Sequence, residues 1–207
     1  MGRPRKMDQA VVIGYPPDRD VADRSLTVGP GARLRSGTVI YLGSEIGRDL
    51  ETGHGVVVRE ECEIGDGVWM WSNTVVDYGC VIGAGARLHT GVYVAQYSRI
   101  GAGAFLAPGV KLLNDPHPGC ALSRECMMGP TIGRNAVIGG GSVILPMVRV
   151  GDGAFIGAGS VVTRDIPAGA VAWGIPARIR GRKTALRCSS GHQVVPYPRT
   201  VAHRKHR

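Results

Sequence analysis

His89 is the residue of this chain best suited to move a proton near neutral pH. A neutral imidazole can accept the proton that an amine or a hydroxyl group gives up when it attacks an electrophilic carbon. No serine or cysteine stands out together with a histidine and an acid, as covalent catalysis would require. We therefore expect direct proton transfer at His89 rather than a covalent intermediate.

A metal site is the second chemistry that these residue types could support. A zinc hydratase needs three converging histidines and an open coordination position. His54, His89 and His117 are spaced 35 and 28 residues apart, and no two of them lie a few residues from each other. Cys188 and His192 have no second ligand pair at zinc-site spacing. We expect no metal and keep a zinc hydratase as an alternative.

The elements that position His89 follow from a six-residue period. An aliphatic or near-aliphatic residue recurs at every sixth position from Val28 to Leu112, and again from Ile132 to Val162. A helix or an ordinary strand pair does not produce this period, but an all-β coil of short flat strands does. Every third hexad opens with an aliphatic residue followed by glycine, which indicates 18-residue coils with three faces. We predict a parallel β-helix with about seven coils between residues 28 and 167.

The period also divides the chain into parts. Ile100 and Ile132 are 32 residues apart instead of 18, which places a 14-residue insertion within about 113–131. A long loop in a strict repeat is usually functional. We expect residues 1–27 to form an N-terminal cap or arm, 28–181 to form the β-helix with a closing segment, and 182–207 to form a basic, flexible tail.

Stacking by 18 residues aligns the side chains of successive coils into columns. On the second face, the column directly after the inward-facing residues contains in order Arg35, Gly53, Trp71, His89, Ala107, Gly139 and Gly157. The next column contains Ser36, His54, Ser72, Thr90, Pro108, Gly140 and Ala158. The first half of this face is polar and bulky, whereas the second half has only alanine, glycine and proline. His89 lies where the two halves meet.

The bare half could bind an extended ligand through exposed backbone groups. Three or four coil steps span about 14–19 Å, although glycine at a corner is also favoured by backbone geometry. We name this region the smooth track, and its predicted contacts are Ala107, Gly139, Gly140, Gly157 and Ala158. Arg178 and Arg180 follow the last coil and could meet phosphate groups.

The polar half holds the candidate substrate contacts His54, Trp71 and Thr90. His54 and Thr90 belong to one column and are two coils apart, about 10 Å. Trp71, directly beneath His89, could stack on a nucleotide base or fill an interface between subunits. Both interpretations of Trp71 remain open.

Composition and charge exclude several other classes. The chain has 32 glycines among 207 residues and a net charge of +9, yet residues 7–181 hold 15 basic and 16 acidic side chains. The basic excess therefore belongs to the ends, and we do not expect nucleic acid as a partner. No apolar run is long enough to span a membrane and no leader opens the chain, so we expect a cytoplasmic protein that does not bind membranes.

Together with the hexads, the sequence IGAGSVVTRDIP at 156–167 and GIPAR at 174–178 resemble the hexapeptide-repeat acyltransferases. The resemblance covers about residues 28–181. It implies a left-handed parallel β-helix, a homotrimer, and acetyl-CoA as a co-substrate bound between neighbouring subunits. The left hand rests on this kinship alone, since strand crossovers ordinarily favour the right hand.

Within that superfamily, residues 114–118 (NDPHP) are similar to a loop of N-acetyltransferases that act on amino-sugar nucleotides. The similarity implies that Asn114 and Asp115 hold the acceptor, with His117 as an alternative base, and we expect the loop to fold over the junction at His89. A pantetheine arm would suit the length of the smooth track. His89 departs from some relatives, which carry amides there.

Three alternatives to this N-acetyltransferase remain. The first is an O-acetyltransferase that acts on a small hydroxylated acceptor. The second is a zinc hydratase resembling the γ-type carbonic anhydrases. The third is a trimeric scaffold without catalytic activity, although the inserted loop and the change along the second face argue against it.

Overall fold

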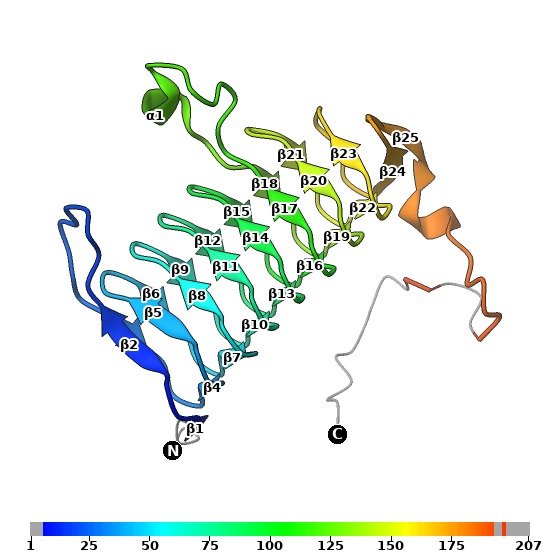
Figure 1. Cartoon of the computed structure of the whole chain (residues 1–207). Helices are drawn as coiled ribbons and strands as arrows, with labels where there is room; N and C mark the ends of the chain where they lie inside the picture. Colours follow the sequence, from blue (N-terminus) through cyan, green and yellow to red (C-terminus); the bar gives the residue numbers. More distant parts are fainter. Residues whose placement is uncertain (1–5, 193–195, 198–207) are drawn as a thin grey trace.

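The computed structural model describes residues 6–192, 196 and 197, which form a solenoid of stacked β-coils (Figure 1). Three parallel sheets, here called A, B and C, make the three faces. About eight coils are present instead of the expected seven, because β1 (Lys6–Met7) and β2 (Val12–Tyr15) add one strand each to sheets A and B ahead of the first hexad. The predicted all-β, left-handed parallel β-helix is confirmed.

The remaining strands follow the hexads. Sheet A contains β4 (Arg33–Leu34), β7 (Glu51–Thr52), β10 (Trp69–Met70), β13 (Arg87–Leu88), β16 (Phe105–Leu106), β19 (Val137–Ile138), β22 (Phe155–Ile156), β24 (Ala170–Gly174) and β25 (Ala177–Arg182). Sheet B contains β5 (Val39–Tyr41), β8 (Val57–Val58), β11 (Val75–Val76), β14 (Tyr93–Val94), β17 (Lys111–Leu112), β20 (Val143–Ile144) and β23 (Val161–Val162). Sheet C contains β3 (Thr27–Val28), β6 (Glu45–Ile46), β9 (Glu63–Ile64), β12 (Val81–Ile82), β15 (Arg99–Ile100), β18 (Thr131–Ile132) and β21 (Arg149–Val150).

From β3 to β23, the second residue of each two-residue strand points inward and builds the core. Leu88 pairs with Leu106, and Leu106 pairs with Ile138 across the inserted loop, so the register continues past the interruption. All three side chains are fully buried. A single coil cannot bury its inner face, and stability comes from stacking these residues on the coils above and below.

Two long loops leave the solenoid at the corner between sheets B and C, and both project on the same side in Figure 1. The first connects β2 to β3. The second connects β17 to β18 and contains the short helix α1 (Ser123–Cys126), which places the predicted insertion in this connection. Most of the other corners are four-residue turns, which a left-handed residue such as Gly91 (φ 70°) or Asn73 (φ 58°) closes.

The C-terminal end is closed by a hairpin. β24 continues sheet A parallel to β22, and β25 then returns antiparallel to β24. A single turn of 3₁₀ helix, η1 (Lys183–Ala185), follows. The expected tail lies partly outside the described residues. Within the described part of the chain, no helix is both long enough and apolar enough to cross a bilayer.

Candidate active site

His89 lies in a column of outward-facing side chains where sheet A turns into sheet B. Its imidazole stacks on the indole of Trp71, with 4.1 Å between ring centroids and 7° between ring planes. The ring of Phe105 is tilted against it at 4.8 Å. Trp71 follows β10, one coil before His89, as the 18-residue stacking predicted, and Phe105 lies on β16 of the next coil. The imidazole is thus half-buried between two aromatic rings.

The surroundings of His89 favour its neutral form. Partial burial lowers the pKa of His89, and the positive charge of Arg87 lowers this pKa further. The Arg87 guanidinium lies 5.2 Å from the ring centroid of Trp69 and, among the described residues, has no carboxylate partner. An imidazole that is neutral at pH 7 can accept a proton. His89 therefore meets the electrostatic requirement for a general base.

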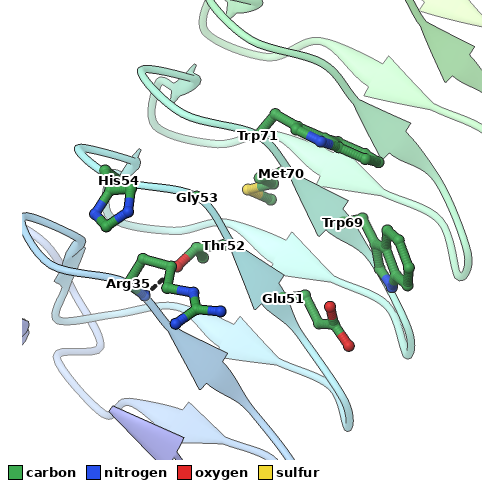
Figure 2. Close-up of a pocket in the computed structure, with 8 residues that line it drawn as sticks. All are labelled: Arg35, Glu51, Thr52, Gly53, His54, Trp69, Met70 and Trp71. Atoms are coloured by element: carbon green, nitrogen blue, oxygen red, sulfur yellow. Dashed lines mark hydrogen bonds between the residues drawn. The ribbon is translucent and has the colours of Figure 1, made fainter. Parts of the chain in front are cut away.

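Beneath Trp71 the column opens into a hollow of about 220 Å³ (Figure 2). Its lining consists of Arg35, Glu51, Thr52, Gly53, His54, Trp69, Met70 and Trp71. Gly53 adds no side chain to the column, so Arg35 and Trp71 lie on either side of an open space. His54 is exposed at the rim, and its Nδ1 is 2.8 Å from Oγ of Ser36.

The three predicted substrate contacts share one corner of the prism. Trp71 touches His89, and Thr90 is the next residue along the chain, with an exposed side chain. His54 lies one coil below Trp71, and its backbone N–H donates to Oγ of Ser72 at 3.1 Å. Their role in binding stays a prediction.

On the other side of His89, the smooth track is bare for a reason internal to the coil. A Cβ atom on Gly139 would lie 2.4 Å from the backbone nitrogen of Ala158, and one on Gly157 would lie 2.8 Å from Cβ of Trp173. Contacts this short require glycine at both positions. A Cβ on Gly140 would meet the carbonyl oxygen of Pro108 at 3.2 Å. The track is thus a fixed feature of the stacked coils.

Trp173 ends this track, and the sequence reasoning missed it. Its side chain is 45% exposed above Gly157, and the residue pairs with Arg178 across the hairpin. The guanidinium carbon of Arg180 lies 5.9 Å from the indole centroid. Both predicted phosphate contacts therefore flank an exposed aromatic ring. The spacing of 16 residues between Gly157 and Trp173 breaks the 18-residue count, which is why stacking by hexads does not find it.

The inserted loop begins with side chains that are held firmly. Asn114 is buried, and its Nδ2 donates to Oε1 of Gln96 at 2.7 Å. The carboxylate of Asp115 accepts from the backbone N–H of His117 at 2.8 Å and from the hydroxyl of Ser123 at 2.5 Å. His117 itself is exposed. These bonds fix the first turn of the loop.

Within one chain, this loop and His89 lie at opposite ends of sheet B. His89 precedes β14, whereas Asn114 follows β17, the parallel neighbour of β14. The loop therefore does not fold over the junction at His89 as we expected. It leaves at the far corner, and the N–H of Met128 closes it there by donating to the carbonyl of Asn114 at 2.8 Å.

A buried ionic cluster at this far corner was also missed by the sequence reasoning. The side chain of Glu60 is 0% exposed and lies 2.6 Å from Nε of Arg19 and 2.9 Å from Nη2 of Arg59. Arg19 also pairs with Glu61 and lies over the ring of Tyr78 at 4.2 Å. Arg19 thus holds the β2–β3 loop against the coils. In the sequence, Arg19 stands out only as a charged residue that lies outside the repeat.

The described residues contain no group of three or more histidine, cysteine, aspartate or glutamate side chains that could hold a metal ion. His89 stacks on Trp71, His54 bonds Ser36, and His117 lies on the loop at another corner. The zinc alternative therefore gains no support. Cys62 and Cys80 are buried free thiols, as small core residues would be.

Comparisons with known proteins agree with the repeat and with the fold. Residues 129–164 match the family model described as bacterial transferase hexapeptide (six repeats). Nodulation protein L of Rhizobium meliloti (strain 1021) is 45% identical over 36% of this chain and 43% of its own length. The dTDP-3-amino-3,6-dideoxy-alpha-D-galactopyranose 3-N-acetyltransferase of Aneurinibacillus thermoaerophilus is 51% identical over 26% of this chain and 24% of its own. The chain thus spans less than half the length of these curated relatives.

Among solved structures, a UDP-N-acetylglucosamine acyltransferase from Campylobacter jejuni is similar in fold. Its TM-score is 0.57, its identity is 20%, and the match covers 86% of this chain and 75% of that one. The coiled architecture and the repeat define a hexapeptide-repeat protein of the β-helix class. Over these segments the chain is similar to bacterial hexapeptide-repeat transferases, including acetyltransferases.

Proposed function

We propose that this protein is an acetyl-CoA-dependent acyltransferase that N-acetylates the amino group of a nucleotide-linked sugar. The observation that carries the proposal is the position of His89. Its imidazole, kept neutral by burial and by Arg87, lies between an aromatic, polar surface and the smooth track. An acceptor on one side and a thioester on the other would meet at this residue. The sequence matches to acetyltransferases support the reaction class.

The reaction needs one proton acceptor and no covalent enzyme intermediate. The amine nitrogen attacks the thioester carbonyl carbon, a C–N bond forms, and the C–S bond breaks. His89 takes the proton that the nitrogen loses and returns it to the departing sulfur, so the products are the amide and the free thiol. Backbone N–H groups of the coils are the natural donors to the oxyanion.

Acetyl-CoA would lie along the smooth track with its nucleotide at the closing hairpin. Ala107, Gly139, Gly140, Gly157 and Ala158 leave the backbone accessible to an extended pantetheine arm. Trp173 would stack on the adenine, and Arg178 and Arg180 would meet the phosphates. The four coil steps from His89 to Trp173 measure about 19 Å, which agrees with this arrangement.

A homotrimer would complete the site. Because Asn114 and His89 lie at opposite ends of sheet B in one chain, the loop of a neighbouring subunit would bring Asn114 and Asp115 to the acceptor. His117 would approach with them and is the alternative base. A sugar nucleotide is the acceptor class that this loop favours.

The test is acetyl transfer to amines by the full-length protein, followed through release of the CoA thiol. His89→Ala and Asn114→Ala should each lower turnover by about 10²–10⁴-fold, while sedimentation and circular dichroism still report a folded assembly. His117→Ala is the matched comparison and should keep most of the activity. Normal turnover in both the His89 and Asn114 variants would show that the site is wrong. Loss of activity only in the His117 variant would make that residue the base.

The same assay decides between acceptor classes. The CoA thiol should be released faster with nucleotide-linked amino sugars as acceptors than with small alcohols. Preference for alcohols would indicate an O-acetyltransferase with the same base. A protein that binds no CoA by calorimetry would be a scaffold, and stoichiometric zinc in the purified protein would revive the hydratase.

A further inference from the structure

The hollow beneath Trp71 lies in a column of stacked side chains, at a position where the column has no side chain. Arg35, Gly53 and Trp71 occupy the same position on three successive coils. Arg35 and Trp71 are therefore two coil steps apart, about 10 Å. With glycine between them, this space holds no side chain. A planar ring that enters it would lie parallel to the other rings of the column.

The empty position is permanent. A Cβ atom at Gly53 would lie 2.4 Å from the backbone nitrogen of Ser72 and 2.7 Å from its Oγ. No residue other than glycine fits there without moving the next coil. The gap is therefore part of the coil packing and does not depend on a rotamer of a neighbouring residue.

The two boundaries of the gap are suited to an aromatic ligand. One face of the Trp71 indole is covered by His89. The indole also lines the hollow together with Gly53 (Figure 2). Across the gap, the Arg35 side chain is 60% exposed, and its one ion pair among residues 6–192 is a long contact of 3.6 Å to Asp8. A guanidinium group and an indole both stack well on a flat π-system.

The rim supplies polar groups beside this stacking site. Glu51 lines the hollow on sheet A and shares its carboxylate with Arg33 at 3.1 Å, which leaves lone pairs for a ligand N–H group. His54 lies on the opposite side, with Nδ1 engaged by Ser36 and, within the described part of the chain, no partner at Nε2. A ring with N–H and carbonyl edges would therefore find partners on both sides.

Between this hollow and His89 lies a cation without a carboxylate partner in the described part of the chain. Arg87 rests on the ring of Trp69, which also lines the hollow, and it is close enough to His89 to lower the pKa of that residue. A phosphate group that passes the edge of Trp71 would meet Arg87. Hollow, cation and base thus follow one another along the outer face of sheet A.

We infer that the hollow at Gly53 is a nucleobase slot in which the base of the acceptor nucleotide stacks between Trp71 and Arg35. The inference rests on the proposed function, because it concerns the acceptor of that reaction. The diphosphate then lies against Arg87, and the sugar amine reaches His89. The base and His89 lie on opposite faces of Trp71, two coil steps or about 10 Å apart. The ribose and the two phosphates span this distance.

A second copy of the chain is the competing occupant of the hollow, and charge argues against it. Arg35 and Arg87 would both need acidic partners in a protein interface, whereas a nucleotide diphosphate supplies the anion itself. The hollow is also continuous with the column of His89. A side chain of a protein interface does not need to reach His89 from the hollow, but the acceptor of the reaction does.

The test is calorimetric titration of the full-length protein, without acetyl-CoA, with UDP, dTDP, CDP, GDP and ADP, and with pyrophosphate as the ligand without a base. At least one nucleoside diphosphate should bind about 5- to 150-fold more tightly than pyrophosphate, the factor that stacking of one base supplies. Trp71→Leu should remove this advantage. Arg87→Gln should weaken both kinds of ligand. Tyr15→Leu, an exposed aromatic on sheet B, is the matched control and should bind like the wild type.

Three results would overturn the slot. They are a Trp71→Leu variant with wild-type nucleotide affinity, a failure of all five nucleotides to bind more tightly than pyrophosphate, and dissociation of the oligomer by Trp71→Leu, which would make the hollow an interface. Should the variant not fold, magnetisation transfer from the Trp71 indole to the bound base in the wild type gives the same decision. Acetyl transfer to simple amines would survive failure of the slot. Nucleotide binding without any transfer would instead reject the proposed function.

Discussion

At the scale of single residues, the proton affinity of His89 depends on a neighbour that contacts it only through its charge. Arg87 has the same position on sheet A as Trp69 and Phe105, and its guanidinium is held over the Trp69 ring. Burial and this charge both disfavour the imidazolium form and lower the pKa of His89. The imidazole is thereby free of its proton over more of the neutral range.

Arg87→Gln should shift the pH profile of acetyl transfer. In the wild type, kcat/KM should fall with decreasing pH only below the ordinary histidine pKa, because the pKa of His89 is lowered. Removal of the charge raises this pKa, so the acid limb should move to higher pH. The measurement is kcat/KM from pH 5 to 8 with one amine acceptor. An unchanged acid limb would mean that His89 is not the titrating base.

Glu60 presents the opposite electrostatic case. Burial alone would raise the pKa of this carboxyl group, but a hydrogen bond from its own backbone and the guanidinium groups of Arg59 and Arg19 outweigh that effect and lower it. The charged form is therefore the stable one inside the cluster. A sequence position with two adjacent glutamates gives no hint that one of them is buried and the other exposed.

Glu60→Gln should destabilise the fold by about 1–3 kcal/mol at pH 7. Because the pKa of Glu60 is lowered in the folded state, its contribution is present above the unfolded-state pKa, about 4.3, and is lost as pH falls through the folded-state value. The difference in thermal unfolding between wild type and variant should thus shrink in acid. Glu61→Gln, the exposed neighbour, should change stability by at most about 1 kcal/mol. Equal destabilisation by both variants, or a difference that persists at pH 3, would contradict the role of the cluster.

At the scale of elements, the hairpin of β24 and β25 determines how the smooth track ends. β24 keeps the direction of sheet A, yet its Trp173 sits against a glycine that is 16 residues earlier. The missing two residues belong to the shortened connection between Val162 and Ala170. The close approach of Trp173 to Gly157 is what brings the exposed indole to the end of the track.

Gly157→Ala should disturb this end of the molecule. The new methyl group would start 2.8 Å from Cβ of Trp173, and displacement of β24 should cost about 1–3 kcal/mol of unfolding free energy. Affinity for CoA, measured by calorimetry, should fall with it. Gly181→Ala, on β25, meets no atom within 4 Å and serves as the control. A Gly157 variant with the same unfolding free energy and the same affinity for CoA as the wild type would refute the contact between β22 and β24.

The elements that repeat were predictable, and those that break the repeat were not. The position of every hexad strand and the stacking of His89 on Trp71 followed from counting by 18, because identical coils can pack in one register only. Trp173 escaped because its coil is shorter. The direction of the inserted loop escaped because it is set by single hydrogen bonds, such as that from Asn114 to Gln96, which no period encodes.

At the scale of the whole molecule, the separation of Asn114 from His89 makes a prediction about assembly. If neighbouring subunits share each site, a chain that lacks His89 and a chain that lacks Asn114 complement each other. In trimers that form at random from the two variants, a site is active only when its His89 comes from the Asn114 variant and its Asn114 comes from the His89 variant. About a quarter of the sites should therefore recover activity. The measurement is thiol release after the two inactive variants are unfolded together and refolded. A mixture with no recovery would place both residues of a site in one chain, and co-purification of one variant with an affinity-tagged form of the other provides the control that mixed assemblies have formed.

The closing hairpin has one more consequence, which concerns growth rather than catalysis. A parallel sheet that ended without a cap would present free N–H and C=O groups on its last strand. The β1 edge of a second solenoid could pair with that strand, and the molecules would then join end to end as a fibre. β25 reverses the strand direction and carries Arg178, Arg180 and Arg182 along the outermost strand of sheet A. Two molecules that approach each other through their β25 edges would therefore repel each other, because both edges are positively charged. The strand that flanks Trp173 therefore also keeps the repeat finite.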